Sequence, residues 1–265
     1  MISSLQKKWL NIAWRAVADG ERVAMKAFDV TKAPKLSFKA HHEIVTQADL
    51  NTNDAIKRVL AKLTPHIPIL SEEGGTVGIE EGLKADLAWV IDPIDGTTNY
   101  AARLPLWGIS LGLIRDGEPI LGTISLPALK QRYHAVLGNG SWMGSTRLQV
   151  TKTKKIEETV GFLCYGYDER DKKLGLKANK ALSEVSRSTR RLGVATLEAA
   201  WVAAGRADYS VMHGIKPWDV AAGSLIVREA GGDVVTPAGK NWRLGQPDIV
   251  YSTPGVTPSI IRHLK

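Results

Sequence analysis

Residues 87–99 read LAWVIDPIDGTTN, an apolar run that ends in two aspartates, a glycine and two threonines. A short apolar run bounded by turn residues is typical of a buried strand. The residue before a proline is pushed toward extended geometry, so Asp92 continues the strand and Pro93 turns the chain away. Asp95 arrives three residues after Asp92, close enough to share a ligand with it.

The residues after Asp95 suit an anion. Gly96 permits a close backbone approach, and Thr97 and Thr98 add hydroxyl and N–H groups that would face an anion if a helix begins there. Two carboxylates beside an anion site need a cation between them, and Mg²⁺ bridging protein to phosphate is the common solution. An ordinary Asp-Gly turn is the alternative for this segment alone, whereas the spacing of its acids excludes an EF-hand loop.

Three further acids have similar surroundings and ordinary alternatives. Glu72 follows an apolar run, and in isolation it would be interpreted as part of an ordinary surface turn. Asp219 lies in the first turn of an expected helix, where it would complement the helix dipole. Asp49 stands three residues after Thr46, at the spacing of a capping box. Each alternative is the better explanation in isolation, and only the joint occurrence of the segments favours a shared site.

The periodicity of apolar residues predicts an α+β half followed by an alternating α/β half, tightly packed, with a soft boundary that divides the chain into 1–147 and 148–265. The expected helices cover 3–28, 47–63, 172–186, 195–204, 217–230 and a short C-terminal segment. The expected strands cover 67–70, 87–91, 107–114, 119–126, 132–138, 160–165, 189–192, 208–212 and 248–252.

The composition is that of an ordinary globular protein: of 265 residues, 44% are hydrophobic and 23% are charged, which excludes disordered and fibrous classes. The single cysteine, Cys164, excludes a disulfide within the chain and is interpreted as a buried thiol. No apolar stretch has the length of a signal peptide core or a membrane span, so the expected location is the cytoplasm.

The net charge of +8 suits an anionic partner, such as a phosphorylated metabolite, nucleic acid or an acidic membrane surface. A solvated basic surface is the plainer explanation. The basic clusters at 151–155 and 187–191 lack the interleaved aromatic residues that a nucleic-acid groove favours. Nucleic acid is therefore not the expected partner, although the charge permits it, and no membrane partner is expected.

Taken together, five segments resemble the inositol monophosphatase family in order and spacing: EIVTQAD, ILSEEGG, WVIDPIDGTTNY, RLGVATLEAAWVAAGRADYS and KPWDVAAGSLIVREAGG. Members of this family are Mg²⁺-dependent, lithium-sensitive phosphomonoesterases related to fructose-1,6-bisphosphatase. The resemblance implies a layered αβαβα sugar-phosphatase fold, usually a homodimer, and a small phosphorylated substrate such as inositol 1-phosphate.

The resemblance also implies roles for individual residues. Two or three Mg²⁺ ions would be held by the carbonyl of Ile94 and the side chains of Glu72, Asp92, Asp95 and Asp219. Gly96 and Thr97 would present N–H groups to the phosphate. The attacking water would be oriented by Thr97 and Asp49, with help from Glu72. A metal-acidified water attacking phosphorus in line, with a second metal stabilising the leaving alkoxide, is the mechanism that such a site supports.

The alcohol side of the substrate would be lined by Gly193, Val194 and Ala195. Three positions depart from the family pattern: Glu43 replaces the usual aspartate, Val194 replaces a serine or threonine, and Met212 aligns with the glutamate that contacts inositol. Methionine is a poor hydrogen-bond acceptor. We therefore expect inositol 1-phosphate to be hydrolysed but not preferred.

Two alternatives stay open. Within the same superfamily, the chain could be a fructose-1,6-bisphosphatase, a histidinol-phosphatase or a nucleotide 3′-phosphatase, although DGTTN favours the inositol-type branch. Outside enzymology, it could be a basic, dimeric binding protein that docks to RNA or to a transcription complex and keeps only residual activity.

Overall fold

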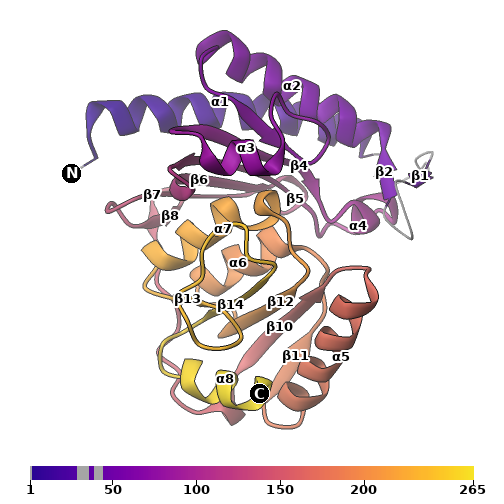
Figure 1. The fold of residues 1–265 in the computed structure, drawn as a ribbon, viewed down its shortest axis with the longest axis vertical. Helices are drawn as coiled ribbons and strands as arrows, with labels where there is room; N and C mark the ends of the chain where they lie inside the picture. Colours follow the sequence, from indigo (N-terminus) through magenta and orange to yellow (C-terminus); the bar gives the residue numbers. More distant parts are fainter. Residues whose placement is uncertain (1, 29–35, 39–43) are drawn as a thin grey trace.

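The protein folds into five stacked layers, helix, sheet, helix, sheet, helix, in a computed structural model that describes residues 2–28, 36–38 and 44–265 (Figure 1). The side chains of 36–38 and 44–45 are not described, and Glu43 lies outside the described residues together with most of 31–42. This arrangement confirms the predicted αβαβα fold class. The helices of the layers are α1 (Ser4–Ala27), α2 (Gln47–Leu63), α5 (Glu169–Ser183), α6 (Ala195–Ala203), α7 (Pro217–Glu229) and α8 (Thr257–Leu264).

The first sheet has seven strands in the order β3-β4-β5-β6-β7-β8-β9. The β3–β4 pair is parallel and all later pairs are antiparallel, so most of this sheet is a meander built along the chain. Its strands are β3 (Ile69–Ser71), β4 (Ala88–Asp95), β5 (Gly108–Arg115), β6 (Glu118–Leu126), β7 (Gln131–Val136), β8 (Ser141–Met143) and β9 (Thr146–Arg147).

The second sheet has five strands in the order β11-β10-β12-β14-β13. Strands β10, β11 and β12 are parallel, so their carboxyl ends meet at one edge, while β14 runs antiparallel between β12 and β13. The strands are β10 (Val160–Tyr165), β11 (Ser188–Arg190), β12 (Tyr209–His213), β13 (Asp233–Val235) and β14 (Asp248–Ser252). Since the first sheet ends before residue 148 and the second begins after it, we retain the halves 1–147 and 148–265 as a proposal.

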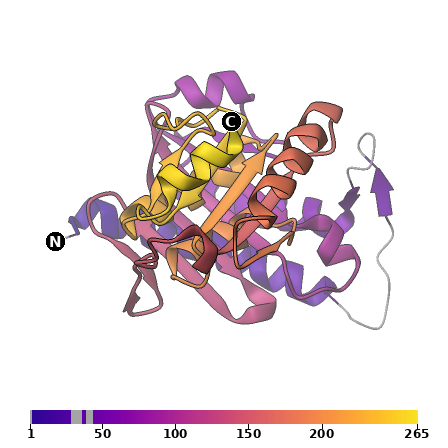
Figure 2. The same ribbon diagram turned by 90° about the horizontal axis from the view of Figure 1, so that it is seen from below.

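Helices cover the outer face of each sheet. Helices α1 and α2 pack on the first sheet over one apolar cluster, and they approach so closely that a Cβ on Gly20 would lie 2.8 Å from Ile56. Figure 2 shows α5 and α8 in front of the second sheet, and Figure 1 places them at the end of the molecule opposite α1 and α2. There they cover a second apolar cluster. The sheets therefore present their other faces to the middle layer.

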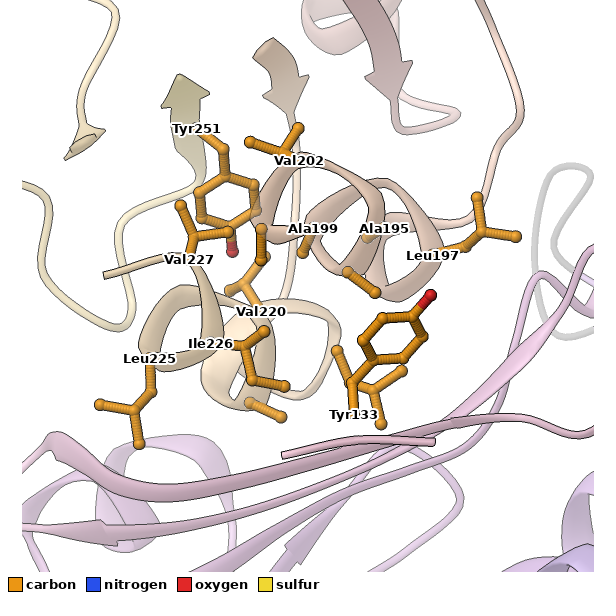
Figure 3. Close-up of a cluster of buried hydrophobic side chains, with 14 of the residues drawn as sticks. Tyr133, Ala195, Leu197, Ala199, Val202, Val220, Leu225, Ile226, Val227 and Tyr251 are labelled. Atoms are coloured by element: carbon orange, nitrogen blue, oxygen red, sulfur yellow. The ribbon is translucent and has the colours of Figure 1, made fainter. Parts of the chain in front are cut away.

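The middle layer consists of α6 and α7, and both helices are apolar nearly all round because both sheets cover them. Figure 3 shows their side chains between Tyr133 of the first sheet and Tyr251 of the second. Glycine lets α7 lie directly on the first sheet: a Cβ on Gly122 would lie 2.7 Å from the carbonyl oxygen of Ala222. This contact fixes the position of α7 relative to the first sheet.

The end of β4 differs from the prediction. The strand does not stop before Pro93 but continues to Asp95, and its pairing with β5 shifts register between Asp92 and Asp95. A proline is tolerated at such a bulge because the ladder hydrogen bond is already interrupted there. Short elements were also missed by periodicity: α3 (Ile79–Lys84), the hairpin β8–β9, β13, and the pair β1 (Leu36–Phe38) and β2 (Ile44–Thr46).

Candidate active site

The turn after β4 is built around Gly96. All eight residues of β4 are buried, and Gly96 has a φ of +86°, in the left-handed region that favours glycine. A Cβ at this position would lie 2.7 Å from Cγ2 of Val194, so the turn also sits directly against the loop before α6. Helix α4 (Thr97–Ala101) starts immediately afterwards. The turn therefore leads directly from Asp95 into the start of α4, at the place where a phosphate was predicted.

Four of the acids that the sequence singled out, all except Asp49, share one cavity of about 340 Å³. Glu72 follows β3, Asp92 and Asp95 end β4, and Asp219 lies in the first turn of α7. All four carboxylates line the cavity, as does Ile94. The structure thus brings together every residue predicted to hold a metal, from two neighbouring strands and the middle-layer helix.

Backbone N–H groups hold three of these carboxylates in place. Asp92 accepts a hydrogen bond from the N–H of Ile94 at 3.1 Å, and Asp219 accepts one from the N–H of Lys216 at 2.7 Å. Asp95 accepts one from the N–H of Thr196 at 2.6 Å, which ties the first sheet to α6. In metal sites, outer contacts of this kind orient the oxygens that bind the ion.

The carboxylates disfavour one another's charge. Burial raises the pKa of Asp92 well above its usual range, and the charges of Glu72, Asp95 and Asp219 raise it further. Burial likewise raises the pKa of Asp219 well above its usual value, and it raises the pKa of Asp95 to about 6 despite the hydrogen bond from Thr196. A divalent cation among these acids would offset both the cost of burying their charges and the repulsion between them.

The chemistry of the donors fits Mg²⁺. The set consists of carboxylate and carbonyl oxygens without cysteine or histidine, which suits a hard ion rather than zinc. Within residues 2–28, 36–38 and 44–265, no three acid, histidine or cysteine side chains are drawn together closely enough to hold an ion as they stand. The acids therefore share a cavity wall, and closing around an ion requires side-chain adjustment.

Asp49 makes both of the contacts that were predicted for it, one that caps α2 and one with Thr97. It accepts the N–H of Thr46 at 2.8 Å and so caps α2, as the capping-box spacing predicted. Its other carboxylate oxygen lies 3.1 Å from the hydroxyl of Thr97, which also lies 3.0 Å from the carbonyl of Ile94. The buried Asp49 carboxylate thereby links the start of α2 to the turn after β4.

The predicted alcohol side is only partly at the cavity surface. Gly193 and Ala195 line the cavity, while Val194 is buried beneath them against Gly96. Met212 is 0% exposed and packs in the central core, so the structure does not place it against the substrate's alcohol, which corrects that expectation. Side chains alternate along β12, and that of Met212 falls on the face covered by the middle layer.

The cavity has a second wall that sequence reasoning missed. It comes from the carboxyl ends of β10 and β12 and the loops that follow. The nitrogen Nδ1 of His213 lies 3.1 Å from Asp248, which is itself paired with Arg170. Thr98, which the sequence singled out beside Thr97, lines the cavity from α4. The lining residues of the second wall are Cys164, Tyr165, Gly166, Tyr167, Arg191, His213, Gly214, Ile215, Lys216 and Trp218.

Cys164, interpreted from the sequence as a buried thiol, is more exposed than expected. It is half-buried, and it lines the cavity. Burial raises the pKa of its thiol well above the usual value, and the charge of Glu198 adds to the effect. The raised pKa favours the protonated thiol, which fits a structural role better than a reactive one.

Comparison with known proteins places the chain among phosphoric monoester hydrolases. The sequence profile of the inositol monophosphatase family matches residues 5–265, and the protein belongs to this family. It is 34% identical over 259 residues to inositol-1-monophosphatase of Mesorhizobium japonicum, covering 97% of this chain and 96% of that protein. It is 32% identical over 259 residues to Nus factor SuhB of Pasteurella multocida, covering 97% and 95%.

A solved structure agrees with the fold. The crystal structure of the extragenic suppressor protein suhB from Bartonella henselae matches with a TM-score of 0.90 at 27% identity, covering 97% of this chain and 98% of that one. Among the described residues, no helix is both long enough and apolar enough to cross a membrane.

Proposed function

We propose that the protein is a Mg²⁺-dependent phosphomonoesterase that hydrolyses a small sugar, polyol or related phosphate, with inositol 1-phosphate among its substrates. The observation that carries the proposal is the meeting of four carboxylates and the Gly96 turn in one cavity. Mg²⁺ held there would act as a Lewis acid and make a bound water acidic. Glu72, Asp92, Asp95, Asp219 and the carbonyl of Ile94 would hold two or three such ions.

The chain's own residues supply positioning. The N–H groups of Gly96 and Thr97 bind phosphate oxygens. The Thr97 hydroxyl donates a hydrogen bond to the Asp49 carboxylate. A lone pair of Thr97 Oγ1 then remains to accept a hydrogen bond from the attacking water. Glu72 accepts the other proton of that water. Holding the nucleophile in line with phosphorus in this way lowers the entropic part of the barrier.

The test is a set of about twenty phosphomonoesters assayed with Mg²⁺ and with excess chelator. We expect hydrolysis only with Mg²⁺, and Asp95→Asn should lose at least ~10²-fold in kcat because it weakens a carboxylate that would hold the ion. The exposed Asp86, which precedes β4 outside the cavity, offers the control Asp86→Asn with full activity. Full activity in excess chelator would refute the proposal.

A second candidate function has one supporting observation, the similarity to a protein named Nus factor SuhB. Together with the net charge of +8, it favours a role in binding RNA or a transcription complex. Retention on RNA should then fall steeply with salt concentration. If the protein is not retained on RNA even at low salt but does hydrolyse a phosphomonoester, the binding proposal fails and the enzymatic proposal stands.

Family membership supports three further proposals: a homodimer, inhibition by Li⁺ and a cytoplasmic location. Light scattering coupled to size-exclusion chromatography measures the first. Titration of Li⁺ against Mg²⁺-dependent activity measures the second, and cell fractionation measures the third.

A further inference from the structure

We propose that Asn99 is a positioning residue: it holds the loop before α6, residues 191–194, against the helix that begins at the turn after β4, and it thereby sets the shape of the cavity on the alcohol side. This inference rests on the proposed function, because the alcohol is the part of the phosphomonoester that leaves. Asn99 closes the segment DGTTN, yet it does not line the cavity. Its effect would therefore pass through the backbone that its side chain holds.

The side-chain amide of Asn99 joins three segments that are distant along the chain. From α4, its nitrogen Nδ2 donates one hydrogen bond to the carbonyl of Leu106 at 2.9 Å and another to the carbonyl of Leu192, also at 2.9 Å. Leu106 precedes β5, whereas Leu192 lies between β11 and α6. An amide nitrogen has two N–H donors, and both are used here.

The loop that Asn99 holds has neither helix nor strand over residues 191–194. Gly193 in this loop has a φ of +69°, and a Cβ there would meet nothing within 4 Å, so the loop is open on this side, where it lines the cavity. A segment outside regular structure owes its position to contacts of this kind, because it lacks the regular hydrogen bonds of a helix or sheet.

The other side of the loop is held by packing. Val194 lies against the turn after β4, since a Cβ on Gly96 would lie 2.7 Å from Cγ2 of Val194. Asn99 holds Leu192, so the loop is fixed on both sides of Gly193. Loss of the Asn99 amide would release one side and leave the packed side in place.

The acids of the site are held independently of this amide. They come from the ends of β3 and β4 and from α7, whereas Asn99 bonds to the loops before β5 and α6. A misplacement of about 1 Å can cost about 10²-fold in rate. If the loop shifts and the acids do not, the loss should fall on substrates whose alcohol must fit against the loop.

The experiment compares kcat/KM for myo-inositol 1-phosphate with kcat/KM for p-nitrophenyl phosphate, whose leaving group carries no ring of hydroxyls to be positioned. We expect Asn99→Ala to lower this ratio by about 10- to 100-fold. Asn99→Asp keeps the size of the side chain but removes both donors, so it should lower the ratio as well. Asn139→Ala is the matched control, because Asn139 also donates from Nδ2 to a carbonyl, that of Leu137, and does not line the cavity.

Two kinetic outcomes would overturn the inference. A ratio that stays the same in both Asn99 variants would show that the amide does not affect the alcohol side. Equal losses on both substrates leave the ratio unchanged too, and they would assign Asn99 to the placement of the phosphate instead.

Hydrogen exchange needs no turnover, so it tests the inference even if the proposed hydrolysis fails. We expect the amides of residues 191–195 to exchange about tenfold faster in Asn99→Ala than in the wild type, and at the wild-type rate in Asn139→Ala. Mass spectrometry of a peptide that spans this segment measures the rates. Unchanged exchange in Asn99→Ala contradicts the inference. Faster exchange, in a protein whose wild type hydrolyses neither ester, would support the role of Asn99 in holding the loop and refute the proposed function.

Discussion

Thr97 joins three parts of the site through a single hydroxyl. It lies within hydrogen-bond distance of Asp49 and of the carbonyl of Ile94. We expect Thr97→Ala to lower kcat by about 10²- to 10³-fold, because a positioned proton acceptor contributes that much, while KM changes little. Steady-state kinetics with Thr97→Ser as the control should show most of the activity retained. A change confined to KM would assign Thr97 to phosphate binding alone.

Met212 allows a prediction opposite in sign to the one that family comparison suggests. Its side chain is 0% exposed, so Met212→Glu would place a carboxylate in an apolar core. We expect the variant to lose roughly 2–5 kcal/mol of unfolding free energy without a gain on inositol 1-phosphate. Denaturant titration against Met212→Leu checks this. A stable variant with improved inositol phosphate turnover would show that the side chain reaches the cavity.

At the scale of elements, the packing of α7 against the first sheet determines the position of Asp219, because Asp219 lies in the first turn of α7. A Cβ on Gly122 would lie 2.7 Å from the Ala222 carbonyl, which is backbone and cannot rotate away. Gly122→Ala should therefore destabilise the fold by about 1–3 kcal/mol and weaken Mg²⁺ binding as α7 shifts. Gly78→Ala is the control, since its Cβ would meet nothing within 4 Å. Unchanged unfolding and Mg²⁺ titrations for Gly122→Ala would contradict this account.

Helices and strands were predictable where one local signal dominated. The helix expected over 47–63 is α2, Gln47–Leu63, because the Thr46–Asp49 cap and the following Thr64-Pro65 mark both of its ends. The continuation of β4 past Pro93 was not predictable, since it depends on a bulge in its pairing with β5. Local sequence determines where a chain can turn, but pairing partners determine whether it does.

The same distinction separates the two walls of the site. The acidic wall was predictable because its residues carry their chemistry in short motifs, as at Asp92 and Asp95. The wall with Tyr165 and His213 was not, because it depends on β10 and β12 being neighbours although α5, β11 and α6 lie between them along the chain. The order of strands in a parallel sheet is set by the packing of the whole chain, so no local motif predicts it.

At the scale of the whole molecule, the acids act on stability as well as on function. Burial and the neighbouring carboxylates raise the pKa of Asp92, so its charged form costs folding free energy when no cation is present. We expect Mg²⁺ to raise Tm, by the linkage between ligand binding and folding. Asp92→Asn should raise Tm in chelator and abolish the rise with Mg²⁺, which differential scanning calorimetry measures. If Mg²⁺ left the Tm of the wild type unchanged, that result would contradict a metal site at this position.

Two exposed residues at the mouth of the cavity, Thr98 and Tyr167, bridge its two walls with hydroxyls that lie 3.2 Å apart. Both residues line the cavity, Thr98 from α4 and Tyr167 from the loop before α5. One hydrogen bond of this kind is worth about 1 kcal/mol net, which leaves roughly one molecule in six with the bridge open at any moment. Opening and closing of this hydrogen bond is then fast compared with turnover at ordinary enzyme rates. Departure of the dephosphorylated alcohol would not wait on this bridge, and the overall rate would be set deeper in the cavity.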